Sequence, residues 1–260
     1  MINPKVLVGC PVYNGVKYCI KEFLESVKNI DYPNYDILLV DNSKEDNFFN
    51  ELQSEKGIKL IKDDTNEEKN NLRVVSSRNK ILNYALDKNY DYVLMMDVDV
   101  IPPKNIITEL LKDNKEIVSG LYYNYFMVND KQKYNPVCWR EIDDELFEKI
   151  KEKLKLPELV KSKTDMRRFI TPEEANSGET LKVKIPSAGC MLIKRNVFEK
   201  IMYGILNIPG IESSDDIFFC MKAREAGFGL YCNTRIKCEH LIMGKFQKDE
   251  KGNLRNPFYT

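Results

Sequence analysis

The chain has 260 residues, 43% of them hydrophobic, which is enough for one α/β domain with a full core. Its 40 basic residues balance 40 acidic ones, so no overall field attracts the chain to nucleic acid or to an anionic membrane. No apolar run approaches the roughly 18 residues that span a bilayer, and the amino terminus lacks the apolar segment of a signal peptide.

The seven cysteines are odd in number, scattered, and mostly embedded in apolar runs. This pattern is typical of reduced thiols in a core and not of a disulfide framework or a zinc ribbon. We therefore expect a soluble, cytoplasmic protein that could still contact a membrane peripherally. Nothing in the sequence indicates an oligomeric state.

Residues 5–123 alternate between short apolar strands and amphipathic helices, the pattern of a parallel α/β sheet. The expected strands are 5–10, 35–40, 58–61, 92–96 and 117–123, and the expected helices are 20–27, 47–52 with Asn47 as its cap, 72–86 and 103–111. The charged residues 63–71 predict a loop. The first strand ends in Pro11, Asn14 and Gly15, a turn whose backbone can come close to a ligand.

Residues 124–184 are less regular, with a charged amphipathic helix expected over 141–155 and a polar linker over 172–180. The polar face of that helix mixes both signs, so we expect it to be solvated and packed on the domain; a membrane-surface helix is the alternative. Long excursions from a compact sheet tend to carry function, so we expect this insert to shape a binding cleft.

Regular structure returns at residue 185. Strands are expected at 191–193, 230–232 and 236–238, and helices from near Arg195 and over 217–226. The polar tail 245–260 carries a turn signal at Gly252.

The motif Asp97-Val98-Asp99 directly follows the buried strand 92–96. Side chains alternate along an extended segment, so both carboxylates should point to one side with Val98 turned into the protein. Adjacent carboxylates repel each other unless a divalent cation neutralises them. Mg²⁺ or Mn²⁺ bound by one or two carboxylates usually shares its other positions with water and a substrate diphosphate. The pair therefore predicts a cation site; the alternative is that both residues only cap the next helix.

Six motifs in this order resemble those of the GT-A glycosyltransferases, especially the inverting family 2 type. They are Pro11-Val12-Tyr13-Asn14, Val40-Asp41-Asn42-Ser43, Ser77-Arg78-Asn79, Asp97-Val98-Asp99, Ser187-Ala188-Gly189-Cys190-Met191 and Ser214-Asp215-Asp216-Ile217-Phe218-Phe219-Cys220. The match covers roughly residues 4–123 and 185–242. Residues 124–184 have no counterpart, and Ser214-Asp215 stands where the family has Gly-Glu.

The resemblance implies an α/β, Rossmann-like GT-A fold: a single domain with a mostly parallel sheet, helices on both faces and an irregular helical insert. It implies a domain over 1–244, with a nucleotide-binding half 1–123, the insert 124–184, an acceptor and catalytic half 185–244, and the tail 245–260. The implied activity is metal-dependent, inverting transfer of a hexosyl-type sugar from a nucleotide-diphosphate sugar, such as a UDP- or GDP-sugar. The acceptor would be a glycan, lipid or protein-linked hydroxyl, and the cofactor Mn²⁺ or Mg²⁺.

The same resemblance implies a role for each motif. Asp216 or Asp215 would be the general base, with Asp216 favoured because it matches the family's final Asp. Asp99 would ligate the metal directly, Asp97 would contact the ribose or a metal-bound water, and His240, the only histidine, would complete the cation's shell. The implied nucleotide-sugar-binding residues are Pro11, Tyr13, Asn14, Asp41, Arg78, Asn79, Asp97 and Val98, and the implied acceptor or sugar-binding residues are Ala188, Gly189 and Cys190.

Each implied role has a structural alternative. Asp216 could be an ordinary helix cap, and Asp41 could form an Asx turn instead of accepting from the nucleobase. Arg78 would reach the diphosphate or the base, or remain a solvated helix arginine. If His240 binds the metal directly, it would favour Mn²⁺ over Mg²⁺. The alternative is that His240 lies at the surface or contacts the metal ligands without binding the metal itself.

Two other functions compete. A sugar-1-phosphate nucleotidyltransferase also has an acidic metal site, but it needs a Gly-rich loop with a basic residue after the first strand, which residues 11–15 do not provide. A non-catalytic nucleotide-sugar or glycan-binding domain is disfavoured because every acidic position of the motifs is present. Hydrolysis of the donor without acceptor would separate that function from catalysis.

Overall fold

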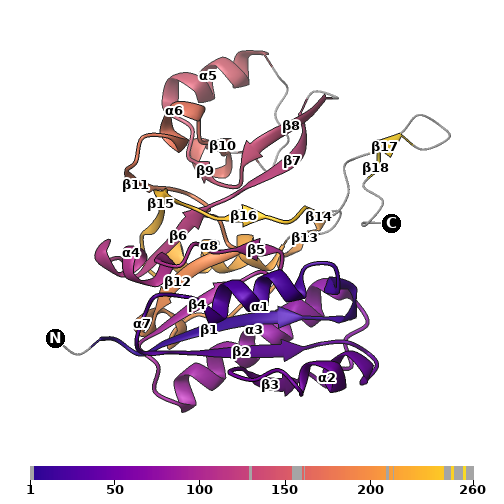
Figure 1. Ribbon diagram of the computed structural model, residues 1–260. Coiled ribbons are helices and arrows are strands. Elements are labelled where there is room, and N and C mark those ends of the chain that lie inside the picture. Colours follow the sequence, from indigo (N-terminus) through magenta and orange to yellow (C-terminus); the bar gives the residue numbers. More distant parts are fainter. Residues whose placement is uncertain are drawn as a thin grey trace.

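The computed structural model describes residues 3–128, 131–153, 160, 162–208, 211–212, 214–242, 247–248 and 254–255. Its central sheet is built from β1 (Val6–Val12), β2 (Tyr35–Asp41), β3 (Lys59–Lys62), β4 (Tyr92–Met96), β6 (Ile117–Leu121), β11 (Thr180–Lys182), β12 (Cys190–Lys194) and β15 (Leu230–Lys237). Their order is β11-β15-β6-β12-β4-β1-β2-β3 (Figure 1). β12 is antiparallel to both neighbours and β11 is antiparallel to β15, whereas every other pair is parallel. The predicted α/β domain with a mostly parallel sheet is confirmed.

Helices cover both faces of this sheet, as predicted. One core layer contains buried side chains of α1 (Ile20–Lys28), α2 (Asn47–Leu52) and α4 (Ile106–Lys112). The other contains those of α3 (Asn70–Asp87), α7 (Arg195–Phe198) and α8 (Asp215–Glu225). Alternate residues of β1 divide between the layers, with Val6 and Val8 in the first and Leu7 in the second.

A glycine lets α3 pack very close to β1. An ideal Cβ added to Gly9 would lie 2.2 Å from Cγ2 of Ile81, so no larger residue fits there without a shift of the helix. Arg78, three residues before Ile81, is thereby placed near the carboxyl ends of the central strands. The packing of this helix thus positions the candidate site.

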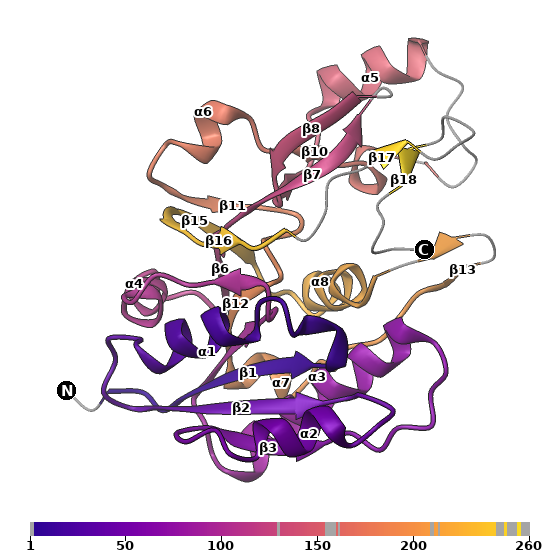
Figure 2. The same cartoon turned by 45° about the vertical axis from the view of Figure 1, so that its right-hand side comes forward.

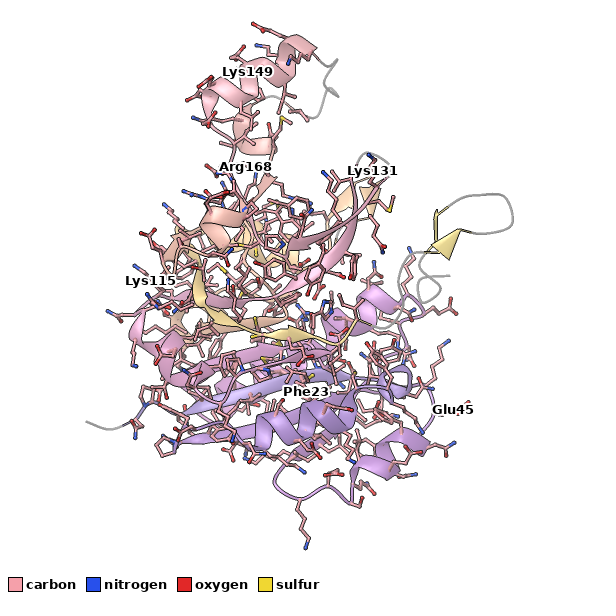
Figure 3. The ribbon with its side chains drawn as sticks, turned by 45° about the horizontal axis from the view of Figure 1, so that its top comes forward. Phe23, Glu45, Lys115, Lys131, Lys149 and Arg168 are labelled. Carbon is pink, nitrogen blue, oxygen red and sulfur yellow. The ribbon has the colours of Figure 1, made fainter. Side chains whose placement is uncertain are left out.

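The insert forms a small layer beyond the sheet (Figures 1 and 2). Apart from β11, which belongs to the central sheet, its elements are the hairpin β7 (Tyr123–Val128) and β8 (Lys131–Pro136), the pair β9 (Trp139–Arg140) and β10 (Arg168–Phe169), the helices α5 (Asp144–Lys153) and α6 (Pro172–Ala175), and the 3₁₀ turn Lys163–Asp165. Phe126, Trp139 and Phe169 pack at its centre with ring centroids 4.9 to 5.9 Å apart. α5 has no buried residue and carries Lys149 at the far end of the insert (Figure 3), which fits the prediction of a solvated helix.

Several elements differ from the sequence prediction. The cap of α2 is Asp46 and not Asn47, α3 starts two residues before the expected helix, and α5 begins at Asp144 and not at residue 141. β15 is one strand with an irregularity between Cys232 and Lys237, where two short strands were expected. The unpredicted pair β5 (Val100–Ile101) and β16 (Glu239–His240) joins the ends of β4 and β15.

The remaining short elements complete the described structure. They are the 3₁₀ turn Asn14–Val16 and the pairs β13 (Asn207–Ile208) with β14 (Ile211–Glu212) and β17 (Gln247–Lys248) with β18 (Leu254–Arg255). Most of the expected tail 245–260, and residues 154–155 of the expected helix, lie outside the described residues. All seven cysteines are buried and unbridged, as expected of core thiols. In the part of the chain that the structure describes, no helix is long and apolar enough to cross a membrane.

Candidate active site

A cavity of about 900 Å³ opens at the carboxyl ends of β1 and β4, which is where ligands bind in open α/β sheets. It lies between the sheet edge, α3, α8 and the hairpin β7–β8. Its lining residues are Pro11, Val12, Tyr13, Gly15, Val16, Tyr18, Asn42, Asn71, Val74, Arg78, Asp97, Val98, Asp99, Asn124, Tyr125, Phe126, Ser214, Asp215, His240 and Ile242. The structure therefore brings together predicted residues from four of the six motifs.

Asp97-Val98-Asp99 forms a tight turn and does not continue β4. The amide of Val100 donates to the carbonyl of Asp97 at 3.1 Å, and the amide of Asp97 donates to the carbonyl of Gly189 at 2.9 Å. Val98 is turned inward and only 7% exposed, as predicted. The carboxylates share the cavity, but the turn directs them to different partners, which simple strand alternation does not anticipate.

Arg78 connects the first carboxylate to the acidic end of α8. Its Nη2 lies 2.7 Å from Oδ1 of Asp97, and its Nη1 lies 3.2 Å from Oδ2 of Asp215. Burial raises the pKa of both Asp97 and Asp215, and the Arg78 charge opposes that shift in each case. The guanidinium stands 5.1 Å from the ring centroid of Tyr203, which stacks on Phe219 at 4.5 Å.

Several polar atoms around Arg78 lack a hydrogen bond. Within the described residues, Nε and Nη1 of Arg78, Oδ2 of Asp215 and the hydroxyl of Tyr203 are buried without a partner of hydrogen-bond geometry. The contact between Arg78 and Asp215 is therefore a charge contact without hydrogen-bond alignment. Buried polar groups are normally satisfied, so these atoms are suited to a polar ligand or to water.

The second carboxylate, Asp99, faces an imidazole. Nε2 of His240 lies 3.3 Å from Oδ2 of Asp99, and Nδ1 of His240 lies 3.0 Å from the carbonyl of Tyr123. The hydroxyl of Tyr18 donates to the same oxygen of Asp99 at 3.2 Å. The pairing of His240 with Val100 across β16 and β5 brings these two groups together. Burial lowers the pKa of His240, but the hydrogen bond and charge of Asp99 outweigh burial and raise it above its usual value.

This donor set fits a divalent cation. A carboxylate oxygen and an imidazole nitrogen face each other, and the carbonyl bonded to the other ring nitrogen fixes the orientation of the ring. The mixture of oxygen and nitrogen suits Mn²⁺ better than Mg²⁺. Among the described residues no three His, Cys, Asp or Glu side chains are grouped to hold a metal, so further ligands would have to come from a substrate or from water.

Asp41 does not line the cavity. Its fully buried carboxylate accepts from the amide and hydroxyl of Ser43 at 3.0 and 2.6 Å, and Lys62 lies 3.1 Å away. The bond to the Ser43 amide is the Asx turn that was the structural alternative to a nucleobase contact. The neighbouring Asn42 lines the cavity instead.

Asn79 also points elsewhere. Its side-chain nitrogen donates to the carbonyl of Tyr203 at 3.0 Å, and its oxygen accepts from the amide of Tyr203 at 2.8 Å. Both ends of the side-chain amide are engaged, and Asn79 is not among the residues that line the cavity. Its bonds hold Tyr203, and Tyr203 lies against the Arg78 guanidinium.

The acceptor-side segment lies behind Asp97. Ala188 and Cys190 are buried, and a Cβ added to Gly189 would lie 2.7 Å from Oδ2 of Asp97 and 2.9 Å from the hydroxyl of Tyr122. Gly189 thus makes room for the carboxylate. None of the three is among the described lining residues.

Two further predicted residues lie just outside the lining. Asp216 is half-buried beside Asp215, and its Oδ1 accepts from the amide of Ile217 at 2.8 Å. Asn14 is exposed, and its backbone N–H donates to the hydroxyl of Ser43 at 2.8 Å. This bond joins the loop after β1 to the loop after β2.

Sequence reasoning missed several residues at this site. Tyr18 was not singled out, although its position in the turn after the first strand was a usable signal. Tyr122, whose hydroxyl accepts from the Gly189 amide at 3.3 Å, and Tyr203 give no local signal, because their partners are 67 and 124 residues away in the chain.

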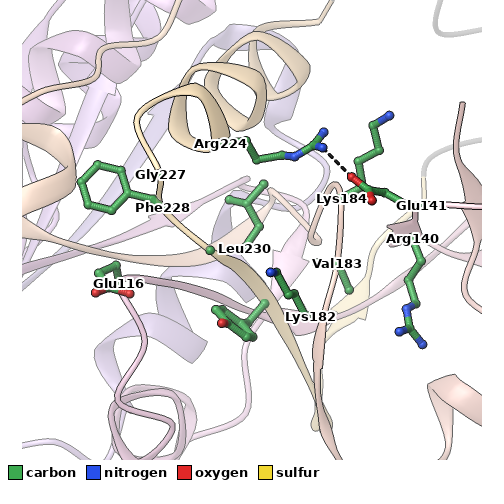
Figure 4. A pocket seen from close by; sticks show the side chains of 12 residues that line it. Glu116, Arg140, Glu141, Lys182, Val183, Lys184, Arg224, Gly227, Phe228 and Leu230 are labelled. Carbon is green, nitrogen blue, oxygen red and sulfur yellow. Dashed lines mark hydrogen bonds and ion pairs between the residues drawn. The ribbon is translucent and has the colours of Figure 1, made fainter. Parts of the chain in front are cut away.

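A second cavity, of about 660 Å³, lies between the insert and α8 (Figure 4). Three of its four basic side chains already have partners: Arg224 pairs with Glu141 at 2.5 Å, Arg140 pairs with Glu174 at 2.6 Å, and Lys184 donates to the carbonyl of Met166 at 3.0 Å. No predicted site residue lines it. We interpret it as part of the contact between the insert and the domain.

Comparison with solved structures gives a similar fold in several enzymes. The structure of GalNAc-T7 with UDP, GalNAc and Mn²⁺ has a TM-score of 0.59 at 15% identity and covers 92% of this chain and 44% of that one. The mannosyltransferase PcManGT from Pyrobaculum calidifontis with GDP-Man and Mn²⁺ gives 0.54 at 16%, covering 94% and 58%. S. aureus TarS 1–349 with UDP-GlcNAc gives 0.52 at 15%, covering 93% and 60%.

The chain therefore spans about half the length of these structures, and at such identities the likeness concerns the fold, which is the predicted GT-A type. A search of curated proteins gave no match. The family model described as Glycosyl transferase family 2 matches residues 8–202, which are 195 of the 260 residues and include five of the six motifs completely. The chain thus belongs to glycosyl transferase family 2.

Proposed function

We propose that the protein is a metal-dependent, inverting glycosyltransferase that transfers a sugar from a nucleoside-diphosphate sugar to an acceptor hydroxyl. The observation that carries the proposal is the convergence of Arg78, Asp97, Asp99, Asp215 and His240 on one cavity at the carboxyl edge of the sheet. Membership of glycosyl transferase family 2 supports the reaction type. The similar structures were solved with UDP, UDP-GlcNAc or GDP-Man, which supports a UDP- or GDP-sugar donor.

On the donor side, the proposal assigns roles to Asp99, His240 and Arg78. Asp99 and His240 would hold Mn²⁺, or less favourably Mg²⁺, and the cation would offset the charge that develops on the departing diphosphate. The unpartnered N–H groups of Arg78 would hydrogen-bond the diphosphate, for which a planar guanidinium is well shaped. Asp97 keeps Arg78 oriented and would contact the ribose or a water.

The acceptor side uses the tandem acids of α8. Asp215 is in charge contact with Arg78, so we assign to it the positioning of that arginine. Asp216 has no ion pair among the described residues, and we assign it the role of general base. The acceptor oxygen attacks the anomeric carbon from the face opposite the diphosphate. The bond to the diphosphate breaks, the diphosphate leaves with the electron pair, and Asp216 takes the hydroxyl proton.

A melting panel of UDP, GDP, CDP and dTDP, each with and without Mn²⁺, tests the donor site. One nucleotide should stabilise the protein only with metal, by about 2.7 kcal/mol at a hundred times its Kd. The Asp99→Ala variant should lose the metal requirement. Stabilisation by no nucleotide, or an unchanged metal requirement in the variant, would refute the donor and metal assignments. Slow hydrolysis of the matching nucleotide sugar without acceptor would then distinguish an enzyme from a binding domain.

A further inference from the structure

The hairpin β7–β8 carries three tyrosines on one face. Tyr125 and Tyr134 are directly paired across the ladder, and their ring centroids are 4.9 Å apart. Tyr123, two residues earlier on β7, stacks on Tyr134 at 5.3 Å with an interplanar angle of 25°. Alternation along a strand places all three on the same side, and we call them the tyrosine shelf.

This shelf continues from the candidate active site. Tyr125 lines the same cavity as Asp215 and Asp99, and the carbonyl of Tyr123 bonds to His240. The hairpin extends away from the sheet above β16, the strand that carries His240 (Figure 2). A molecule lying on the shelf would reach the acids of α8 through the cavity.

The shelf is both aromatic and polar. Tyr134 is 54% exposed, one of three large hydrophobic side chains described as exposed. None of the three phenol hydroxyls has a hydrogen-bond partner in the described part of the chain. Exposed aromatic side chains next to a cavity indicate a binding surface. Because hydroxyl groups lie at the edges of these rings, the surface favours a ligand that has both an apolar face and polar groups.

A pyranose ring has this combination of properties. Its axial C–H groups form an apolar face that packs on an aromatic ring, and its hydroxyls project around the edge where the phenol groups lie. The shelf measures roughly 7 Å along β7 from Tyr123 to Tyr125, which is long enough for one sugar ring. An alkyl chain would leave the hydroxyls unused.

We propose that the tyrosine shelf binds the acceptor and that the acceptor is a saccharide, one of whose hydroxyls enters the cavity. This inference rests on the proposed function and deepens it by naming the acceptor class. The transfer step is the one given above, with a sugar hydroxyl as the attacking group.

Direct binding tests the shelf without any donor. Methyl glycosides of glucose, galactose, mannose and N-acetylglucosamine, with the corresponding β-linked disaccharides, are tested by saturation-transfer NMR. At least one should bind the wild type, and Tyr134→Ala should weaken it by about tenfold, in line with the cost of losing one aromatic contact. Tyr134→Phe should keep most of the binding because the ring remains.

Lys133→Ala is the matched control. Lys133 is the neighbouring residue on β8, is exposed, and alternates to the other face of the hairpin, so its loss should leave saccharide binding unchanged. No binding by any saccharide, or equal binding by wild type and Tyr134→Ala, would overturn the proposal.

A transfer assay separates the acceptor class from the reaction itself. The donor chosen by the melting panel is offered with the bound saccharide, with a polyprenyl phosphate or with a Ser/Thr peptide. Transfer to the saccharide, with a roughly tenfold higher acceptor KM but an unchanged donor KM in Tyr134→Ala, is expected. Transfer only to the lipid or the peptide would contradict the saccharide assignment while leaving the proposed glycosyltransferase intact. Failure of donor binding would contradict the glycosyltransferase itself.

Discussion

Arg78 joins two acids from distant parts of the chain, so its geometry matters more than its charge. It contacts Asp97 after β4 and Asp215 at the start of α8, and its side chain is only 6% exposed. A lysine would keep the charge but could not reach both acids and a diphosphate with one ammonium group. We expect Arg78→Lys to lower kcat/KM by about 100-fold or more, which corresponds to about 2.7 kcal/mol of lost transition-state stabilisation.

The control for Arg78→Lys is Arg195→Lys, which alters an arginine paired with Glu199 far from the cavity. Steady-state kinetics and the melting shift with nucleotide measure both variants. If the Arg78→Lys and Arg195→Lys variants were equally active, Arg78 would contribute only its charge.

Gly189 matters for the space it leaves. Any Cβ there would press on Oδ2 of Asp97 and on the Tyr122 hydroxyl. We expect Gly189→Ala to displace the Asp97 carboxylate from Arg78 and to reduce activity by about tenfold or more, since small displacements at a reacting centre are costly. Activity and the melting temperature should be measured together. Full activity with an unchanged melting temperature would show that Asp97 needs no such room.

Separate variants of the tandem acids test the roles that we propose for them, Asp216 as general base and Asp215 as positioning residue. Asp216→Asn should reduce transfer by about 10²- to 10⁴-fold, the usual contribution of a general base, with donor affinity unchanged. Asp215→Asn should weaken donor binding as well, because it removes a charge that faces Arg78. Parallel measurement of kcat and the nucleotide Kd checks this. The reverse pattern would make Asp215 the base.

At this scale the sequence predicts the acids, the arginine and the histidine, because their motifs are local. It does not predict that Asn79 bonds to the backbone of Tyr203 or that Lys62 pairs with Asp41, although the Asx turn between Asp41 and Ser43 was one of its alternatives. Motif matching identifies a position, whereas the direction of a side chain depends on partners that can lie more than a hundred residues away.

At the scale of elements, α6 had a readable signal that was interpreted only as a polar linker. Thr171 and Glu174 form a capping box, with Pro172 at the first helical position. Glu174 also contacts Arg168 at 2.7 Å and Arg140 at 2.6 Å, so it joins α6 to the pair β9–β10. The hydrogen bonds from Arg168, together with the Thr171 amide and Arg140, lower the pKa of Glu174 to about 2 despite some burial.

This carboxylate predicts a pH-dependent contribution to stability. Because its pKa is lower in the folded state, the contribution is complete above the usual value of 4.5 and is lost as the pH falls toward about 2. Glu174→Gln should cost about 1 to 2 kcal/mol at pH 7, discounted because both arginines are about one third exposed. The difference from wild type should shrink below about pH 4.5.

Denaturant unfolding at a series of pH values measures this difference. Glu173→Gln is the matched control, since Glu173 is a neighbouring carboxylate with no ion pair among the described residues. A constant difference between pH 7 and pH 3 would show that the arginine contacts do not stabilise the insert.

The strands and helices of residues 5–123 were predictable because apolar runs and amphipathic spacing repeat regularly there. The hairpin β7–β8 was not, because its polar and aromatic residues follow neither pattern and packing of Phe126 on Trp139 and Phe169 supports it. The pairing of the two-residue strands β5 and β16 could not be predicted from the sequence either, because it joins residues about 140 positions apart at the sheet edge.

At the scale of the whole molecule, the sheet edge supplies one wall of the cavity, where we propose that the donor binds, and the insert supplies the opposite wall. Tyr125 and Phe126 of the hairpin share one cavity with Pro11 and Tyr13 of the first loop. The sequence predicted that the insert would shape a cleft, and the cavity lining agrees with that expectation. Which hairpin face borders the cavity depends on strand register, which a single sequence without a turn signal does not define.

Asp99 and His240 are the residues that we propose bind a divalent cation together with a nucleoside diphosphate. Electron paramagnetic resonance of Mn²⁺ tests this proposal most directly, because the sharp signal of free Mn²⁺ disappears when the ion is bound. With the nucleotide chosen by the melting panel, the wild type should bind one Mn²⁺ per chain more tightly than the nucleotide does alone, and Asp99→Asn should weaken that binding by about 10- to 100-fold. Equal Mn²⁺ binding by wild type and Asp99→Asn would contradict the account.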